Sequence, residues 1–177
     1  MSTLNTTTKN PNTLQSNSFA MAVSKLPSLS PFVNGVSLPG MVMGEVQLGT
    51  PFADRRVPGD KLIFAVLTIS FLVDEDMQNW LECYDWMTSL GYPESFAQYG
   101  AINRIADKRS SLSGNDVYSD GTLIIHNNSG KAIKKIEFVD LFPIALGEIP
   151  LSTGDTAGDP IISTIDLQYT YYTVNSI

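Results

Sequence analysis

The sequence predicts a mainly β protein, a β-sandwich or β-barrel flanked by a single α-helix. Three observations lead to this prediction. Several short stretches alternate apolar and polar side chains, which is the period of a half-buried strand. Only one stretch, residues 74–91, repeats its apolar residues at helical spacing. Turn residues such as "NNSGK" separate the alternating stretches.

The chain has the length and composition of one globular domain. Of its 177 residues, 43% are hydrophobic and 16% are charged, which is typical of folded proteins with a real core. Residues 1–17, rich in Thr, Asn and Ser, are expected to form a flexible N-terminal arm, and residues 18–177 a single β domain. No stretch is apolar enough to cross a membrane, and the N-terminus lacks the apolar core of a secretory signal.

The net charge of −7 argues against a protein that grips nucleic acid, because binding phosphates requires clustered Lys and Arg. An acidic surface can still face DNA where its role is to prevent adhesion. The single cysteine excludes an internal disulfide.

The strands are predicted from period-2 alternation, taken in chain order. Residues 19–23 and 42–48 each form a half-buried strand. The run 62–73 is apolar on both faces, which is typical of a central strand or of one at an interface between subunits. Two shorter strands, 121–127 and 133–142, are joined by the "NNSGK" turn, and the last strand, 161–171, has the clearest alternation.

Two long connections, 49–60 and 97–121, interrupt these elements. Connections of this length in a small domain are usually functional or become ordered against another surface.

The helix is predicted to begin after Asp74, a good N-cap, and to end near Gly91. Glu75 and Asp76 then lie where the helix dipole favours negative charge. An apolar stripe is expected to cover the sheet, formed by Met77, Trp80, Leu81, Tyr84, Met87 and Thr88. Trp86 lies off this stripe, so it is either covered by a loop of the same chain or reserved for contact with another chain.

The sequence does not have the pattern of an enzyme. Cys83 has no histidine near it in sequence to activate it, and no set of metal ligands accompanies His126. Phosphate-binding glycine motifs, the G-x-S-x-G elbow and C-x-x-C are all lacking. We therefore expect no catalytic residue, metal or other cofactor. Scattered loop acids leave a carbohydrate-binding or glycoside-hydrolysing β-sandwich as a remote alternative.

A series of motifs runs along the chain in a fixed order. The series is "NGVSLPGMVMGEVQLG", "ADRRVPGDKLIF", "VLTISFLVDED", "NWLECYDW", "FVDLFPIALGEIPLS" and "ISTIDLQYTYYTV". Taken together it resembles the tail tube proteins of contractile-tailed bacteriophages. The resemblance covers residues 18–174, and the ordered set carries it, since no single motif is specific.

This resemblance implies a structural virion protein. In that family, a β-barrel with a flanking helix assembles into hexameric rings that stack into a hollow tube inside a contractile sheath. Strands of neighbouring subunits form a continuous inner barrel. Tube-initiating proteins of the baseplate, tail-terminal homologues and type VI secretion tubes look alike at this level and remain alternatives.

The implied partners are further copies of the chain, the sheath protein, the tape measure protein, and the baseplate and tail-terminator proteins. DNA would pass through the lumen without specific binding, and no membrane is involved. The implied location is the phage tail of the virion, after assembly in the host cytoplasm.

The resemblance also suggests roles for particular residues. The 49–60 connection matches the loop between rings, which implies contacts for Asp54, Arg55, Arg56 and Asp60, and Trp86 is a further candidate for a subunit contact. The polar faces of two predicted strands supply the candidates for the lumen, namely Glu45, Gln47, Asp166 and Gln168.

Overall fold

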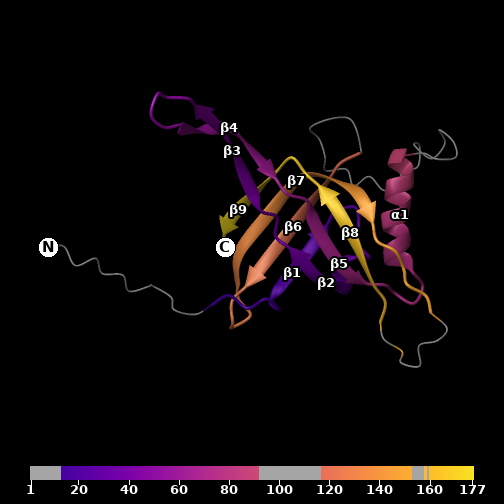
Figure 1. Ribbon diagram of the computed structural model, residues 1–177. Helices are drawn as coiled ribbons and strands as arrows, with labels where there is room; N and C mark the ends of the chain where they lie inside the picture. The colour runs from indigo at the N-terminus through magenta and orange to yellow at the C-terminus, as the bar shows by residue number, and fades with distance from the viewer. Residues whose placement is uncertain (1–12, 92–116, 153–157, 159) are drawn as a thin grey trace.

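The computed structural model describes residues 13–91, 117–152, 158 and 160–177, which form antiparallel sheets with one α-helix (Figure 1). The elements are β1 (Phe19–Val23), the 3-10 helix η1 (Ser30–Phe32), β2 (Val33–Ser37), β3 (Met41–Leu48), β4 (Arg55–Phe64), β5 (Leu67–Leu72), α1 (Gln78–Gly91), β6 (Ser119–His126), β7 (Ala132–Leu146), β8 (Ile162–Gln168) and β9 (Tyr171–Ser176). The predicted fold class is confirmed over these residues. None of the helices in the described ranges has the length and hydropathy to span a membrane.

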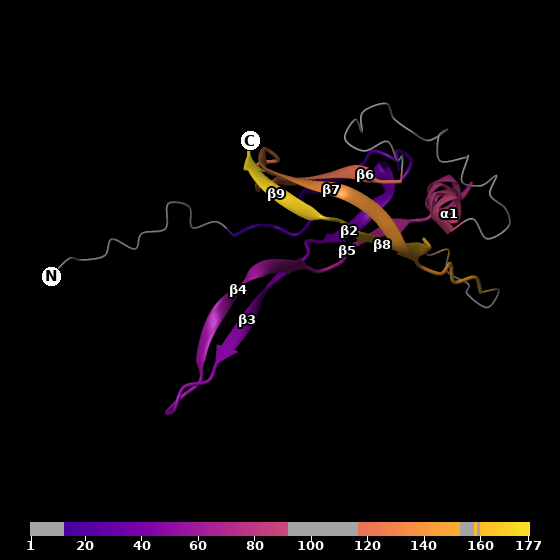
Figure 2. The ribbon, with the colours of Figure 1, turned by 90° about the horizontal axis from the view of Figure 1, so that it is seen from above.

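Seven strands form one sheet in the order β1-β6-β7-β8-β5-β2, with β9 also paired to β7. The long strand β7 belongs to two layers, because its first part pairs with β6 and β9 and its last part with β8. Asp140 lies where the pairing changes and has a φ of 59°, a left-handed conformation that Asp tolerates better than most residues. This kink lets the sheet fold over itself, and β7 curves visibly in Figure 2.

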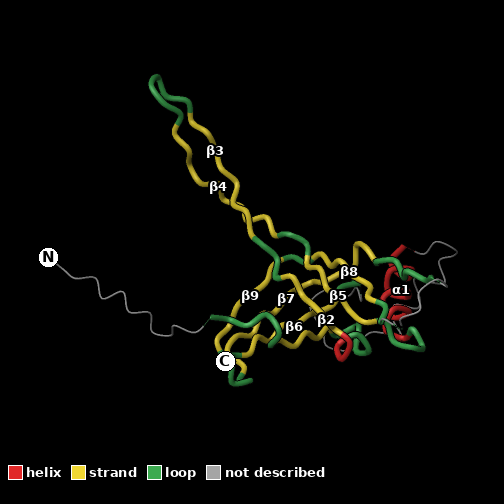
Figure 3. Tube along the Cα trace, turned by 60° about the horizontal axis from the view of Figure 1, so that its bottom comes forward, coloured by secondary structure: helices red, strands yellow, loops and turns green. Residues whose placement is uncertain are grey.

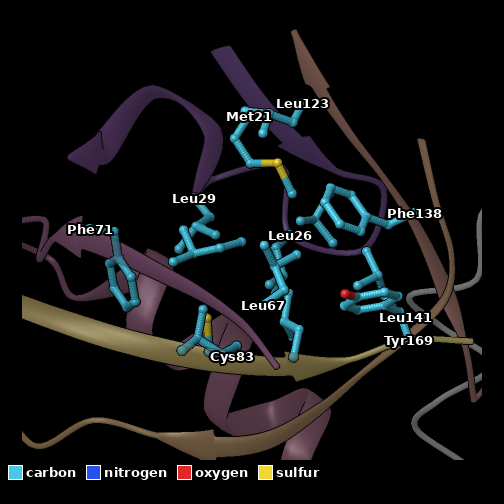
Figure 4. Packing of buried hydrophobic residues seen from close by; sticks show 14 of the residues in the cluster. Met21, Leu26, Leu29, Leu67, Phe71, Cys83, Leu123, Phe138, Leu141 and Tyr169 are labelled. Carbon is cyan, nitrogen blue, oxygen red and sulfur yellow. The ribbon is translucent and has the colours of Figure 1, made fainter. Parts of the chain in front are cut away.

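The core lies between the two layers (Figure 4). Alternate side chains of the strands supply it, as the period-2 pattern predicted for the first and last strands: Met21 and Val23 of β1, and Ile165 and Leu167 of β8, are buried. Two leucines outside any strand, Leu26 and Leu29, fill its centre and are at most 1% exposed.

The predicted strand 62–73 is wrong. The chain leaves one strand pair and enters another at Ala65, whose N–H donates to the Gly40 carbonyl at 3.0 Å. In β5 only alternate residues are buried, namely Leu67, Ile69 and Phe71. The apolar residues Leu62 and Ile63 belong to β4 and are exposed. The continuous apolar run therefore spans two strands, one exposed on the hairpin and one packed against the core.

The predicted orientation of the helix is also wrong. The face that packs on the sheet carries Asn79, Cys83, Trp86 and Ser89, while most of the apolar stripe is exposed or half-buried. The polar side chains on the packed face are satisfied internally. The Asn79 amide donates to the Leu72 carbonyl at 2.7 Å, and the neighbouring Glu82 carboxylate accepts from the Ser28 hydroxyl at 2.6 Å. Hydrogen bonds within the chain allow these polar residues to be buried. The hydrophobic periodicity, which assumes that polar residues face water, therefore predicted the wrong face.

Tyr169 provides a test of the core. Its ring lies 5.2 Å from that of Phe138 and 4% of the residue is exposed, yet its hydroxyl has no hydrogen-bond partner in the described part of the chain. Burial raises the pKa of this phenol to about 12. Tyr169→Phe removes an unsatisfied polar group, so we expect it to raise the free energy of unfolding by about 1 kcal/mol.

The neighbouring Tyr172→Phe is the matched control for this substitution, because the Tyr172 hydroxyl donates to the Pro39 carbonyl at 3.3 Å. Losing that bond should lower the free energy of unfolding by about 0.5–1 kcal/mol. Urea unfolding of both variants measures the difference, and a loss of stability in Tyr169→Phe would contradict this account of the core.

Candidate functional site

The strands β3 and β4 form a hairpin that projects away from the body of the protein, and we call residues 41–64 the projecting hairpin (Figure 3). All eight residues of β3 are exposed, and most of β4 is exposed as well. The expectation of a half-buried strand at 42–48 therefore fails in the single chain. Exposed apolar residues are concentrated here, including Val42 and Ile63 at 64% and Phe52 at 101%.

The predicted 49–60 connection is shorter in the structure, because β4 already begins at Arg55. Pro58 misled the prediction. It lies directly opposite Glu45 within a two-stranded ribbon, where every strand is an edge and the missing N–H breaks no inner ladder. The connection is thus reduced to residues 49–54.

The register of β3 on β4 assigns each residue to one of two faces, because directly opposed residues share a face. The first, which we call the apolar face, carries Val42, Val46, Leu48, Val57 and Ile63, with Arg55 near the tip. The second, the mixed face, is apolar near the body at Met41, Met43, Leu62 and Phe64, and polar toward the tip at Glu45, Gln47 and Arg56. The outer half of the hairpin is therefore amphipathic.

The polar part of the mixed face is organised by its own contacts. The Arg56 guanidinium and the Glu45 carboxylate form an ion pair at 2.9 Å, and the Gln47 amide donates to Asp54. Both members of the ion pair are mostly exposed, so the pair contributes little to stability. It does reduce the net charge that Glu45 presents to its surroundings.

Gly59 allows the strands to meet at an irregularity in the middle of the hairpin. The register shifts between Met43 and Glu45, and a Cβ on Gly59 would lie 2.7 Å from the Gly44 carbonyl oxygen. Such an approach excludes any side chain at Gly59 unless the backbone moves. The close approach of the two strands at this point therefore requires glycine at position 59.

The tip of the hairpin presents Phe52. The Thr50 hydroxyl donates to the Ala53 carbonyl and accepts from the Ala53 N–H, which closes a tight turn around Phe52. The Phe52 side chain is fully exposed.

A second exposed apolar feature lies on α1, on the opposite side of the body from the hairpin (Figures 1 and 2). The helix and the end of β7 enclose an open groove of about 450 Å³, the α1 groove, lined by Trp80, Tyr84, Met87, Thr88, Gly91 and Leu146. The rings of Trp80 and Tyr84 stack with their centroids 5.6 Å apart. The lining is thus mostly apolar and half-buried or exposed, and two of its residues, Trp80 and Leu146, also pack against the edge of the core.

The structure places the predicted contact residues in different settings. Asp54, Arg55, Arg56 and Asp60 all lie on the projecting hairpin and are exposed. Trp86 is only 2% exposed, and its indole N–H donates to the Val117 carbonyl at 3.3 Å. Its ring is therefore covered by its own chain, the first of the two alternatives, and does not offer a surface to another subunit.

The predicted lumen residues fall into two groups. Glu45 and Gln47 lie on the mixed face of the hairpin, whereas Asp166 and Gln168 lie on the half-buried face of β8 that points away from the core. The Thr68 hydroxyl donates to Asp166 at 2.6 Å. Most of the 97–121 connection and of the N-terminal arm lies outside the described residues.

Cys83 is not suited to nucleophilic chemistry. The thiol is fully buried, and desolvation, with a smaller contribution from the Glu82 charge, raises its pKa to about 12. Within the described ranges, no group of His, Cys, Asp and Glu side chains has a metal-binding arrangement.

Comparisons with known proteins agree with this fold. No protein family profile matches the sequence. The chain is similar to the tail tube terminator protein of Enterobacteria phage T4, with 23% identity over 142 residues, 78% of this chain and 74% of that protein.

Among solved structures, the anti-feeding prophage tube terminating cap has a TM-score of 0.58 at 14% identity and covers 95% of this chain and 94% of its own. The sheath-tube complex of the extracellular contractile injection system PVC has a TM-score of 0.58 at 16% identity, covering 94% of each chain. The sheath/tube terminator of that system has a TM-score of 0.57 at 16% identity, covering 93% of this chain and 97% of its own. These likenesses establish a shared fold.

Proposed function

We propose that the protein is a structural subunit of the tube of a contractile tail or injection system, where it assembles as a hexameric ring. The role is mechanical and needs no catalytic group. Sheath, tape measure and baseplate proteins are its proposed partners, and the virion tail its proposed location, with assembly in the host cytoplasm. The sequence similarity to a phage tail tube terminator and the fold shared with tube and terminator proteins support this proposal.

One observation carries the proposal most directly. The apolar face of the projecting hairpin carries five apolar side chains, of which Val57 is half-buried and the other four are exposed, and within the described residues the outer edges of β3 and β4 pair with no further strand. An isolated two-stranded hairpin with such a face is marginal in water and prone to pair with other chains. In a ring, the neighbouring subunit would cover this face and complete the strand pairing, which would close the inner barrel.

The polar end of the mixed face supplies the proposed lining of the lumen. Glu45, Gln47 and Arg56 would face the channel once the apolar face is covered, and Asp166 and Gln168 are further candidates. Since Glu45 is paired with Arg56, the acidic repulsion of DNA would come from the whole acidic chain more than from this residue.

A position at the end of the tube is the second candidate, because the sequence relative is a terminator and so are two of the solved structures with this fold. A main tube subunit would stack ring on ring. A terminator would form one ring and bind the end of a tube made by another protein. The two positions therefore differ in self-stacking.

Electron microscopy of the purified full-length chain, with sedimentation velocity, tests the proposal and separates the two positions. Long tubes at high concentration would favour the main tube subunit, and single six-fold rings the terminator. A chain that stays monomeric at high concentration, even with tail components added, would overturn the proposal.

A further inference from the structure

We propose that Phe52 of one subunit inserts into the α1 groove of a neighbouring copy of this chain. The inference rests on the proposed assembly and specifies one of its contacts. The occupant of the groove is thus a second copy, and the hairpin tip is the part that enters it.

The tip has the form of an anchor. Phe52 is a large aromatic side chain that is fully exposed to solvent. It lies in a turn that is closed by two hydrogen bonds between the Thr50 hydroxyl and the backbone of Ala53. Buried aromatic anchors dominate the binding energy of protein interfaces, whereas a fully exposed phenylalanine gains nothing in the single chain.

The groove has the complementary form. Its walls are the stacked rings of Trp80 and Tyr84 together with Met87 and Leu146, and its volume of about 450 Å³ is large enough for an aromatic ring. Aromatic and methionine walls suit such a guest, because both make favourable contacts with ring faces and edges.

The charges around the two features are also complementary. Residues 74–91, which include α1, contain five acids, Asp74, Glu75, Asp76, Glu82 and Asp85, and no Lys or Arg. The tip, residues 50–56, contains Asp54 and two arginines, of which Arg56 is paired with Glu45 and Arg55 is exposed on the apolar face. The exposed Arg55 near an aromatic anchor is electrostatically compatible with an apolar groove in acidic surroundings.

The two features lie on opposite sides of the molecule in all three ribbon and tube views. A subunit therefore cannot satisfy both by folding back on itself. Complementary surfaces at opposite ends produce a head-to-tail contact, which generates closed rings or stacked assemblies instead of isolated pairs. This is the kind of contact that a tube requires.

Disulfide trapping tests the contact in the full-length chain. The double variant Phe52→Cys with Met87→Cys, oxidised at a protein concentration at which this variant itself forms rings, should give a ladder of covalent multimers on a non-reducing gel. Each single variant should give at most a dimer, because one exposed cysteine per chain can form only one disulfide. Phe52→Cys with Gln78→Cys is the matched control, since Gln78 is exposed on the same helix and does not line the groove. The buried Cys83 thiol does not compete.

A second measurement does not depend on cysteines. Phe52→Ala should raise the protein concentration at half assembly by about tenfold to a hundredfold, and Phe52→Tyr should keep it near the wild-type value. If the double-cysteine variant forms no multimers while rings are visible by microscopy, the groove has another occupant and the inference fails, although the proposed function stands. A disulfide within one chain would also overturn it. If no ring forms at all, both proposals fall.

Discussion

Val46→Asp is expected to abolish assembly while leaving the monomer folded. Val46 lies on the apolar face of the projecting hairpin, opposite Val57, and is 53% exposed in the single chain. A carboxylate there costs the monomer little, because water reaches it. In the assembled state the same carboxylate would be buried without a partner, which costs several kcal/mol. We expect the association constant to fall by at least about a hundredfold.

Gln47→Lys is the matched control, since it also adds a charged side chain, one residue along on the mixed face. The Asp54 carboxylate, which accepts from the Gln47 amide, favours the new charge, while the cross-strand neighbour Arg56 is already paired with Glu45. This variant should assemble like the wild type. Sedimentation velocity measures association, and thermal unfolding verifies that both monomers are folded. If the two variants assemble equally well, the apolar face is not the one that is buried in the assembly, which would contradict this prediction.

Trp86→Ala is expected to have the largest effect on stability. The Trp86 ring is buried between helix and sheet, its N–H is bonded to Val117, and the Lys25 ammonium lies 5.4 Å from the ring centroid. Truncation leaves a large cavity, so the free energy of unfolding should fall by about 3–5 kcal/mol. If the alanine variant does not fold, Trp86→Phe replaces it in the test. It keeps an aromatic ring at this position, so the free energy of unfolding should fall by less.

The other tryptophan of the same helix is the control. Trp80 is half-buried in the wall of the α1 groove, with its N–H donated to the Gly147 carbonyl at 3.3 Å. Trp80→Ala should cost about 1–2 kcal/mol. Because the chain has two tryptophans, the fluorescence of each alanine variant reports the other residue. Urea unfolding that ranks Trp80 above Trp86 would contradict the observed orientation of the helix.

The alternation of side chains predicted most of the sheet. The strands around Met21, Leu123 and Ile165 have one buried and one open face, and period-2 patterns record that directly. The pattern failed at 62–73, because two adjacent strands there have different surroundings and the sequence does not mark the point where the chain leaves the body. Equally, the sequence did not reveal that Val42 and Val46 face solvent in the single chain.

The buried face of α1 could not be predicted from the sequence for a different reason. Its apolar stripe through Trp80 and Tyr84 was taken for the core face, because hydrophobic periodicity assumes that polar residues face water. Asn79 breaks this assumption by bonding to Leu72 and to the N–H of Asp74. One sign was present in the sequence, since Trp86 is too large and apolar to fit a solvent face. The contacts on the hairpin were predicted from its position in the chain and stay a prediction, whereas the α1 groove was not predicted.

The most direct test of the central claim is a cryo-EM reconstruction of the assembled full-length chain. The expected result is a closed six-fold ring in which Val46, Val57 and Ile63 of each projecting hairpin pack against a neighbouring subunit, while Glu45 and Arg56 line the channel. A reconstruction in which these three apolar side chains remain exposed to solvent, or a protein that stays monomeric at every concentration, would contradict the claim.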